Sequence, residues 1–216
     1  MQYLIGDIMA KIMIDMFSGL GGASQAFIND EYNWYVWRLD NNPLLEDIKN
    51  TQITNDMFKT LKCWNLTKSD KTYRPELIWA SPPCREFSSG FNSPSSKMQR
   101  GEEGFENFTP DQGLVKQTID IIQQINPKYW VIENVIGSIK WLKPILGEPT
   151  QIIGSVVLWG NFPFLHMPIG FKENKEDKDV WSTDPLRANK KAKIPYEISM
   201  SLKITIEEQR QLTEWI

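Results

Sequence analysis

Two short segments of the sequence carry side chains that could act together in covalent catalysis. SPPCREFS at residues 81–88 holds Cys84 directly after two prolines, and the sequence ENV holds Glu133. A thiolate is a nucleophile, the prolines restrict the backbone before it, and Arg85 beside it favours the charged form. A carboxyl group can supply or share a proton during the same reaction. We therefore expect a nucleophile and an acid in one site.

A glycine-rich segment, DMFSGLGG at residues 15–22, predicts a second component of this site. Glycines allow a tight turn and close approach to a ligand, and a helix N-terminus after them favours a negative group. Asp40 ends the next predicted strand, where an acid accepts hydrogen bonds from a ribose. Asp56 and Met57, after a strand at 51–53, are expected at an adenine edge, with a plain Asx turn as the alternative. The other expected cofactor contacts are Asp15, Phe17, Ser18, Gly19, Gly21, Gly22 and Asn41.

The order of strands and helices explains how these segments can meet. Apolar patterns predict strands at residues 12–17, 34–39, 51–53, 76–80, 128–133 and 155–159, and helices at 23–30 and 111–125. Strands separated by helices predict an α/β fold, with a mostly parallel, doubly wound sheet covered on both faces. Ligands of such sheets bind beyond the carboxyl ends of the strands, which is where the reactive segments fall.

Composition narrows the class of protein. The chain has 216 residues, 41% hydrophobic and 24% charged, with a formal net charge of −3. These values favour one globular domain and argue against an indiscriminate nucleic-acid coat protein. Cys63, Cys84 and the single histidine, His166, are too few for a disulfide framework or a conventional zinc site. We expect a cytoplasmic protein with no metal and no membrane segment, and we favour a monomer.

Three further segments carry polar or aromatic side chains with a possible role in binding. Residues 88–109 form a long aperiodic stretch, and 160–189 combine an aromatic, turn-rich start with a charge run. Trp159 is expected to stack on nucleic acid. In the tail, Thr205 with Glu208 predicts a helix start. The predicted binding residues in these segments are Ser88, Phe91, Lys97, Arg100, Arg187, Lys190 and Lys191, with Lys193 in the same basic cluster.

Taken together, three motifs resemble the DNA cytosine carbon-5 methyltransferase family over about residues 15–142. DMFSGLGG is similar to its cofactor motif, SPPCREFS to its catalytic Pro-Cys loop and ENV to its Glu-Asn-Val motif, in the same order. The resemblance implies a Rossmann-like S-adenosylmethionine-dependent fold, with Pro83 also at the cofactor. It further implies a duplex DNA substrate whose target cytosine is flipped out, and the binding residues named above would then contact DNA. Cys84 would then add to carbon 6 and Glu133 would assist at the ring nitrogen.

The sequence also departs from the family pattern. Arg85 stands where the family usually has glutamine, and its Gln-x-Arg-x-Arg motif is not recognisable near Gln151. Arg85 is our candidate to hold the base carbonyl in its place. We predict a single catalytic domain over 1–216, with 160–189 as a short target-recognition insertion and 190–216 as a helical return to the cofactor site.

Three alternatives remain open at this stage. An amino-methyltransferase also begins its catalytic motif with Ser-Pro-Pro, but it places an aromatic residue at the position of Cys84. A short recognition region would also suit a free pyrimidine nucleotide as substrate. A non-catalytic cofactor-binding subunit would leave the pairing of Cys84 with Glu133 unexplained. The family is associated with phage genomes and with restriction-modification, and this association does not distinguish between the alternatives.

Overall fold

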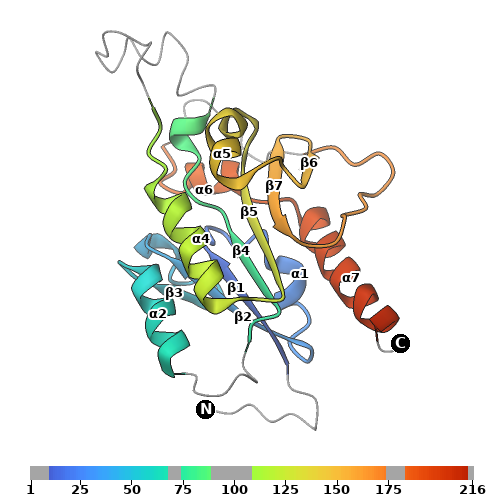
Figure 1. Ribbon diagram of the computed structural model, residues 1–216. Coiled ribbons are helices and arrows are strands. Elements are labelled where there is room, and N and C mark those ends of the chain that lie inside the picture. The colour runs from blue at the N-terminus through green and yellow to red at the C-terminus, as the bar shows by residue number, and fades with distance from the viewer. Residues whose placement is uncertain (1–9, 68–73, 89–108, 174–182, 214–216) are drawn as a thin grey trace, which may run out of the picture.

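A seven-stranded sheet forms the centre of the computed structural model, which describes residues 10–67, 74–88, 109–173 and 183–213. The strand order is β3-β2-β1-β4-β5-β7-β6, parallel from β3 to β5 and antiparallel from β5 to β6 (Figure 1). This confirms the predicted α/β fold with a mostly parallel sheet. The strands are β1 (Lys11–Met16), β2 (Trp34–Asp40), β3 (Thr51–Ile53), β4 (Leu77–Ala80), β5 (Tyr129–Val135), β6 (Gln151–Ile153) and β7 (Val156–Asn161).

Helices cover both faces of the sheet. Alternation along β1 sends Met13 to one face, where it packs in a cluster with α7, and Ile14 to the other, where it packs with α2 and α4. Figure 1 shows α2 and α4 side by side, with α1 and α7 on the opposite side of the sheet. The helices are α1 (Gln25–Ile28), α2 (Met57–Thr67), α4 (Gly113–Ile125), α5 (Ile139–Leu146), α6 (Arg187–Ala192) and α7 (Tyr196–Thr213), with short 3-10 turns η1 (Pro43–Leu45), η3 (Arg85–Phe87) and η5 (Ile136–Ser138).

The antiparallel edge of the sheet, β7 and β6, was only partly expected. A strand was predicted at 155–159, but β6 was not, and nothing in the pattern indicated direction. Ile153 pairs with Val156 across a tight turn in which Gly154 has φ +60°. A turn of two residues can join only antiparallel strands, because a parallel crossover needs a dozen residues or more.

The expected stacking role of Trp159 is wrong. Its side chain is 1% exposed, and its indole N–H donates to the Gly147 carbonyl at 3.2 Å. The reason is tertiary packing, since Trp159 lies in a buried cluster with Val115 of α4 and Leu142 of α5. The next segment is also held to the sheet, because the Gln151 side-chain amide exchanges two hydrogen bonds with the Leu165 backbone, of 2.8 and 2.9 Å.

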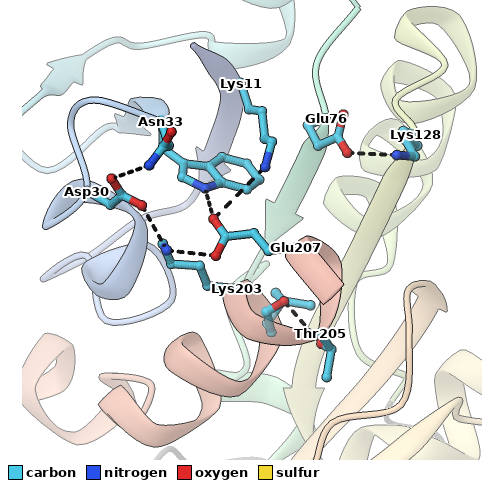
Figure 2. A network of polar contacts seen from close by, with 10 residues as sticks. Lys11, Asp30, Asn33, Glu76, Lys128, Lys203, Thr205 and Glu207 are labelled. Atoms are coloured by element: carbon cyan, nitrogen blue, oxygen red, sulfur yellow. Dashed lines mark hydrogen bonds and ion pairs between the residues drawn. The ribbon is translucent and has the colours of Figure 1, made fainter. Parts of the chain in front are cut away.

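The chain from Tyr196 to Thr213 forms one helix, α7, that continues through Thr205. Thr205 was expected to start a helix, but its hydroxyl donates to the Ser201 carbonyl at 2.8 Å inside α7 (Figure 2). A threonine that bonds back to residue i−4 satisfies itself without ending the helix, which is why the capping interpretation fails. In the part of the chain that the structure describes, no helix is long and apolar enough to cross a membrane.

A polar network joins α7 to the first strands of the sheet. Lys203 Nζ lies 2.9 Å from both Asp30 Oδ2 and Glu207 Oε2, and Glu207 Oε1 accepts the Trp34 indole N–H at 2.7 Å (Figure 2). Lys203 is 14% exposed at its side chain, so these contacts are partly shielded from water. The network therefore fixes α7 against α1 and β2 in addition to the apolar cluster.

We expect Lys203→Met to lower the free energy of unfolding at pH 7 by about 1–2 kcal/mol, because it removes a charged donor from two carboxylates. Burial opposes the shift, but hydrogen bonds from Lys203 and Asn33 lower the pKa of Asp30 below 3.8. A carboxyl group whose pKa is lowered in the folded state contributes stability above pH 3.8, and this contribution is lost as the pH falls. The difference in stability between wild type and variant should therefore shrink at pH 3. Urea unfolding measures this loss of stability, and Lys62→Met, at an exposed position of α2, is the control. Equal effects of the two changes would contradict the network.

Candidate active site

The strand order reverses between β1 and β4, and this reversal positions the site. The chain leaves β1 toward β2 on one side, while β4 and β5 continue on the other. At the carboxyl end of β1, Ser18 N–H donates to the Leu39 carbonyl at 3.1 Å and Ser81 N–H to the Met16 carbonyl at 3.2 Å. In open α/β sheets a ligand crevice lies at such a switch point. The glycine-rich segment and the Pro-Cys segment thus begin side by side.

The loop after β1 has the left-handed backbone that its glycines permit. Phe17, Gly19 and Gly21 have φ of 56°, 52° and 71°. Phe17 is the exception among them, because a bulky residue in this region carries strain that clusters at functional sites. Gly22 is needed for space, since a Cβ there would lie 2.4 Å from the Ile194 carbonyl oxygen. The predicted turn is confirmed, and its backbone packs directly on the segment that precedes α7.

Asp40 holds this loop from the end of β2. Its Oδ2 accepts the Gly19 N–H at 2.8 Å, and its Oδ1 accepts the N–H groups of Asn41 and Asn42 at 2.8 and 2.9 Å. The residue is 8% exposed. The carboxylate that was predicted to receive a ribose therefore also aligns the two loops that border the crevice.

A buried polar network lies beneath the same loop. Arg38 is 2% exposed and donates to the Gly21 carbonyl at 2.9 Å, the Ser24 hydroxyl at 2.8 Å and the Lys49 carbonyl at 3.0 Å. The Ser24 hydroxyl in turn donates to Asp15 Oδ2 at 2.5 Å. A Cβ on Gly21 would lie 2.3 Å from Arg38 Cζ, so the guanidinium occupies the space under the loop. Asp15, predicted as a cofactor contact, is 1% exposed and belongs to this network.

The network predicts a pH dependence that Asp15→Asn would remove. Burial raises the pKa of the Asp15 carboxyl from 3.8 to about 7, against the opposing effects of Ser24 and Arg38. A raised folded pKa gives stability that is full below 3.8 and declines until pH passes about 7. Urea unfolding from pH 4 to 8 should show wild type losing stability relative to the variant up to pH 7, then no further change. A difference independent of pH would contradict the assignment.

Cys84 sits on a turn that is anchored on both sides. The buried Asn134 side chain donates to the Pro82 carbonyl at 3.1 Å, and the Cys84 carbonyl accepts the N–H groups of Phe87 and Ser88, each at 3.1 Å. Phe87 is 3% exposed and packs in the cluster beneath β7 and α5. Cys84 itself is partly exposed. The turn is therefore held by hydrogen bonds before and after Cys84, while Cys84 itself remains partly exposed.

Glu133 lies on the strand next to this turn. β4 and β5 are parallel neighbours, with Ala80 opposite Ile132, so Glu133 comes one residue beyond the last paired residue of β4. Glu133 is partly buried, and the adjacent Asn134 makes the bond to the Pro-Cys turn. The structure brings the predicted nucleophile and acid to the carboxyl ends of neighbouring strands, although β5 continues to Val135 and Glu133 pairs with Leu158 of β7.

The other predicted residues are more dispersed. Asp56 is exposed and its side chain accepts the Lys59 N–H at 2.9 Å, so it caps α2 and does not form the plain Asx turn, while Met57 is 5% exposed in the core. Pro83 is exposed beside Cys84, and Arg85 and Ser88 follow in η3 and its cap, with Ser88 Oγ donating to the Arg85 carbonyl at 2.9 Å. Arg187, Lys190 and Lys191 lie on α6, whereas Phe91, Lys97 and Arg100 lie outside the described residues.

Sequence reasoning missed three residues that shape the site: Arg38, Ser24 and Asn134. An arginine inside an apolar strand is seldom fully buried without partners, so the pattern of β2 already contained a signal for Arg38. Ser24 and Asn134 act through contacts with distant segments and have no such signal. Within the described residues, no cluster of three His, Cys, Asp or Glu side chains could hold a metal ion.

Comparisons with known proteins agree with this geometry. A model of the C-5 cytosine-specific DNA methylase family matches residues 12–141. The probable DNA (cytosine-5)-methyltransferase of Frog virus 3 (isolate Goorha) is 25% identical over 124 residues, 56% of this chain and 52% of that protein. The type II methyltransferase M.HgiGI of Herpetosiphon aurantiacus is 31% identical over 129 residues, 56% of this chain and 88% of that protein.

Among solved structures, the Entamoeba histolytica methyltransferase EhMeth is similar with a TM-score of 0.45 and 16% identity, over 78% of this chain and 58% of that one. The chain spans about half the length of the Frog virus 3 relative. The family match extends from β1 to α5 and so contains the glycine-rich loop, the Pro-Cys turn and the Glu-Asn-Val strand end. On that match, the chain belongs to the C-5 cytosine-specific DNA methylase family.

Proposed function

We propose that this protein transfers a methyl group from S-adenosylmethionine to carbon 5 of cytosine in DNA through a covalent adduct with Cys84. The observation that carries the proposal is the Asn134 to Pro82 hydrogen bond of 3.1 Å, which joins the strand of Glu133 to the turn of Cys84. A nucleophile and an acid on one rigid support, beside a glycine-rich crevice, suit this chemistry. Residues 1–216 would act as one catalytic domain, with 160–189 as a short target-recognition insertion and 190–216 as a helical return to the cofactor site.

The residues around the crevice fit S-adenosylmethionine. The Ser18 hydroxyl is buried and has no hydrogen-bond partner in the structure, although buried hydroxyls are normally paired. It lies between the strained Phe17 and Gly19, whose N–H is held by Asp40. Bound there, the cofactor would supply an electrophilic methyl group. Phe17, Ser18, the loop glycines, Asp40 and Asn41 would bind it, with Asp15 supporting them from below.

Cys84 and Glu133 would perform complementary steps. Carbon 5 of cytosine is a poor nucleophile, so the Cys84 thiolate first forms a bond to carbon 6, and the electrons of the 5,6 double bond move onto the ring. Glu133, sharing a proton with the ring nitrogen, stabilises the charge that develops. After methylation, loss of the carbon-5 proton restores the double bond and expels the Cys84 thiolate. Arg85, exposed on the same turn, would hold the base carbonyl.

DNA would approach the carboxyl edge of the sheet, with the target cytosine flipped from the duplex. Flipping costs a few kcal/mol of unstacking, which contacts around the gap must offset. Ser88 adjoins the Pro-Cys turn, and Arg187, Lys190 and Lys191 supply positive charge from α6. Phe91, Lys97 and Arg100 are proposed to contribute from the segment after Ser88.

Nucleoside analysis tests the proposal. The protein is incubated with S-adenosylmethionine carrying a labelled methyl group and with duplex DNA, and the DNA is digested and analysed by mass spectrometry. We expect the label in 5-methylcytosine. Label in N4-methylcytosine or N6-methyladenine would instead identify an amino-methyltransferase, and label only in added free nucleotide would move the substrate. Cofactor binding with no transfer to any substrate would indicate a non-catalytic subunit.

A further inference from the structure

Beside the glycine-rich loop lies a cavity of about 260 Å³, whose lining is strongly basic. Lys172, Lys190, Lys191 and Lys193 line it, and Glu197 is the acidic residue in its lining. The rest of the lining is Gly22, Gln25, Ile194, Pro195 and Tyr196. Four lysines, Glu197 and the Asp184 carboxylate that pairs with Lys190 give a local charge of about +2, in a chain whose net charge is −3. We name this cavity the lysine pocket.

The fold concentrates this charge from separate parts of the sequence. Lys172 comes from the segment after β7, whereas the other three lysines come from α6 and the link to α7. The Lys190 Nζ lies 2.5 Å from Asp184 Oδ2, which fixes one side of the cluster. Ammonium groups gathered from separate segments around one cavity attract an anion such as phosphate.

The lysine pocket shares a wall with the proposed cofactor site. Gly22 lines the pocket and is so close to Ile194 that a Cβ would lie 2.4 Å from its carbonyl oxygen. Asn189 of α6 also lies beside the loop, since its Nδ2 would be 3.5 Å from a Cβ on Gly19. Its Oδ1 accepts a hydrogen bond from Asn42 Nδ2 at 3.5 Å. The pocket therefore belongs to the same carboxyl edge of the sheet as the Cys84 turn.

From this geometry we infer that the lysine pocket binds a backbone phosphate of the DNA substrate, outside the contacts that read or react with the base. The inference rests on the proposed action on DNA. Ammonium groups act as point charges and select phosphate without reading sequence. A phosphate seated there would hold the duplex at the carboxyl edge while the cytosine enters the crevice. Lys172 and Lys193 would thereby join Lys190 and Lys191 in DNA binding.

Fluorescence anisotropy of a labelled duplex, measured from 50 to about 200 mM salt, tests the pocket. The double variant Lys172→Gln/Lys191→Gln removes two charges from the lysine pocket. The control, Lys59→Gln/Lys62→Gln, makes the same charge change at exposed positions of α2. We expect the pocket variant to bind DNA about tenfold more weakly, with a salt slope shallower by about 1 to 2. The α2 variant should match wild type in both. Equal behaviour of the two double variants would overturn the inference.

A second arm separates DNA from free phosphate. Calorimetry with inorganic phosphate is run on the wild type and on the pocket variant. If phosphate binding depends on the lysines but DNA affinity does not, the pocket takes a free anion and the DNA assignment is wrong. Adduct formation on 5-fluorocytosine DNA is scored independently. Lysine-dependent DNA binding without an adduct would refute the proposed chemistry and support the phosphate site. An adduct with DNA binding that does not depend on the lysines would support the chemistry and refute the phosphate site.

Discussion

Cys84→Ala should abolish the covalent complex with DNA that contains 5-fluorocytosine. The fluorine at carbon 5 cannot leave as a proton does, so a wild-type reaction with S-adenosylmethionine stops at the adduct between Cys84 and carbon 6. This complex should survive denaturation and appear as a shifted band in a denaturing gel. Without the thiol, carbon 5 is never activated, and we expect methyl transfer to ordinary DNA to fall on the order of 10⁴-fold or more.

Cys63 provides a matched control for this experiment. It is an exposed thiol on α2, so Cys63→Ala makes the same chemical change away from the Pro-Cys turn. We expect the Cys63 variant to form the adduct at the wild-type rate. Thermal unfolding of both variants checks that neither loss of activity reflects loss of fold. An adduct that persists in Cys84→Ala, or one that disappears in Cys63→Ala alone, would contradict the assignment of the nucleophile.

Arg38→Met should cause the largest loss of stability among single changes near the site. The guanidinium supplies donors to the Gly21 carbonyl, the Ser24 hydroxyl and the Lys49 carbonyl, and methionine supplies none. Acceptors left unpaired in a buried place each cost about 1–3 kcal/mol, so we expect the free energy of unfolding to fall by about 3 kcal/mol or more. The pKa of Asp15, which Arg38 holds down, should rise further.

Cofactor affinity separates this role from a general effect on stability. Because Arg38 positions the backbone of the glycine-rich loop, the variant should bind S-adenosylmethionine at least about tenfold more weakly at a temperature where it remains folded. Arg38→Lys should recover part of the affinity, since it keeps the charge but loses the planar fork. Arg74→Met is the control, because Arg74, which precedes β4, also donates to two backbone carbonyls, those of Asn126 and Pro127. Equal cofactor affinity in all variants would refute the positioning role.

The reactive segments were predictable because each is local. A glycine-rich turn after a buried strand, two prolines before a cysteine and an acid at a strand end are each contained within about eight residues of sequence. Alternating strands and helices then require a mostly parallel sheet, and such a sheet brings strand ends to one edge. Asp15, Cys84 and Glu133 could be assigned to that edge without coordinates.

Errors and omissions occurred where the outcome depends on distant partners. Trp159 was expected at a surface because its neighbours are glycine and aromatic residues, yet it is buried against Val115 of α4 and Leu142 of α5. Thr205 resembled a helix cap, but an apolar face that continues through Ile198, Leu202 and Ile206 keeps α7 intact against the sheet. Burial by another element decided both cases, and no local pattern reports it.

By itself the sequence determined the class of fold, the order of its motifs and the chemistry that those residues permit. Tertiary structure decided how the site is held: Arg38 under the loop, Asp40 across it, Asn134 behind the Pro-Cys turn, and four lysines gathered beside Gly22. The physical reason is that turns and periodicity arise from neighbours along the chain. Buried hydrogen bonds and clustered charges arise only when segments far apart in sequence share the same small volume.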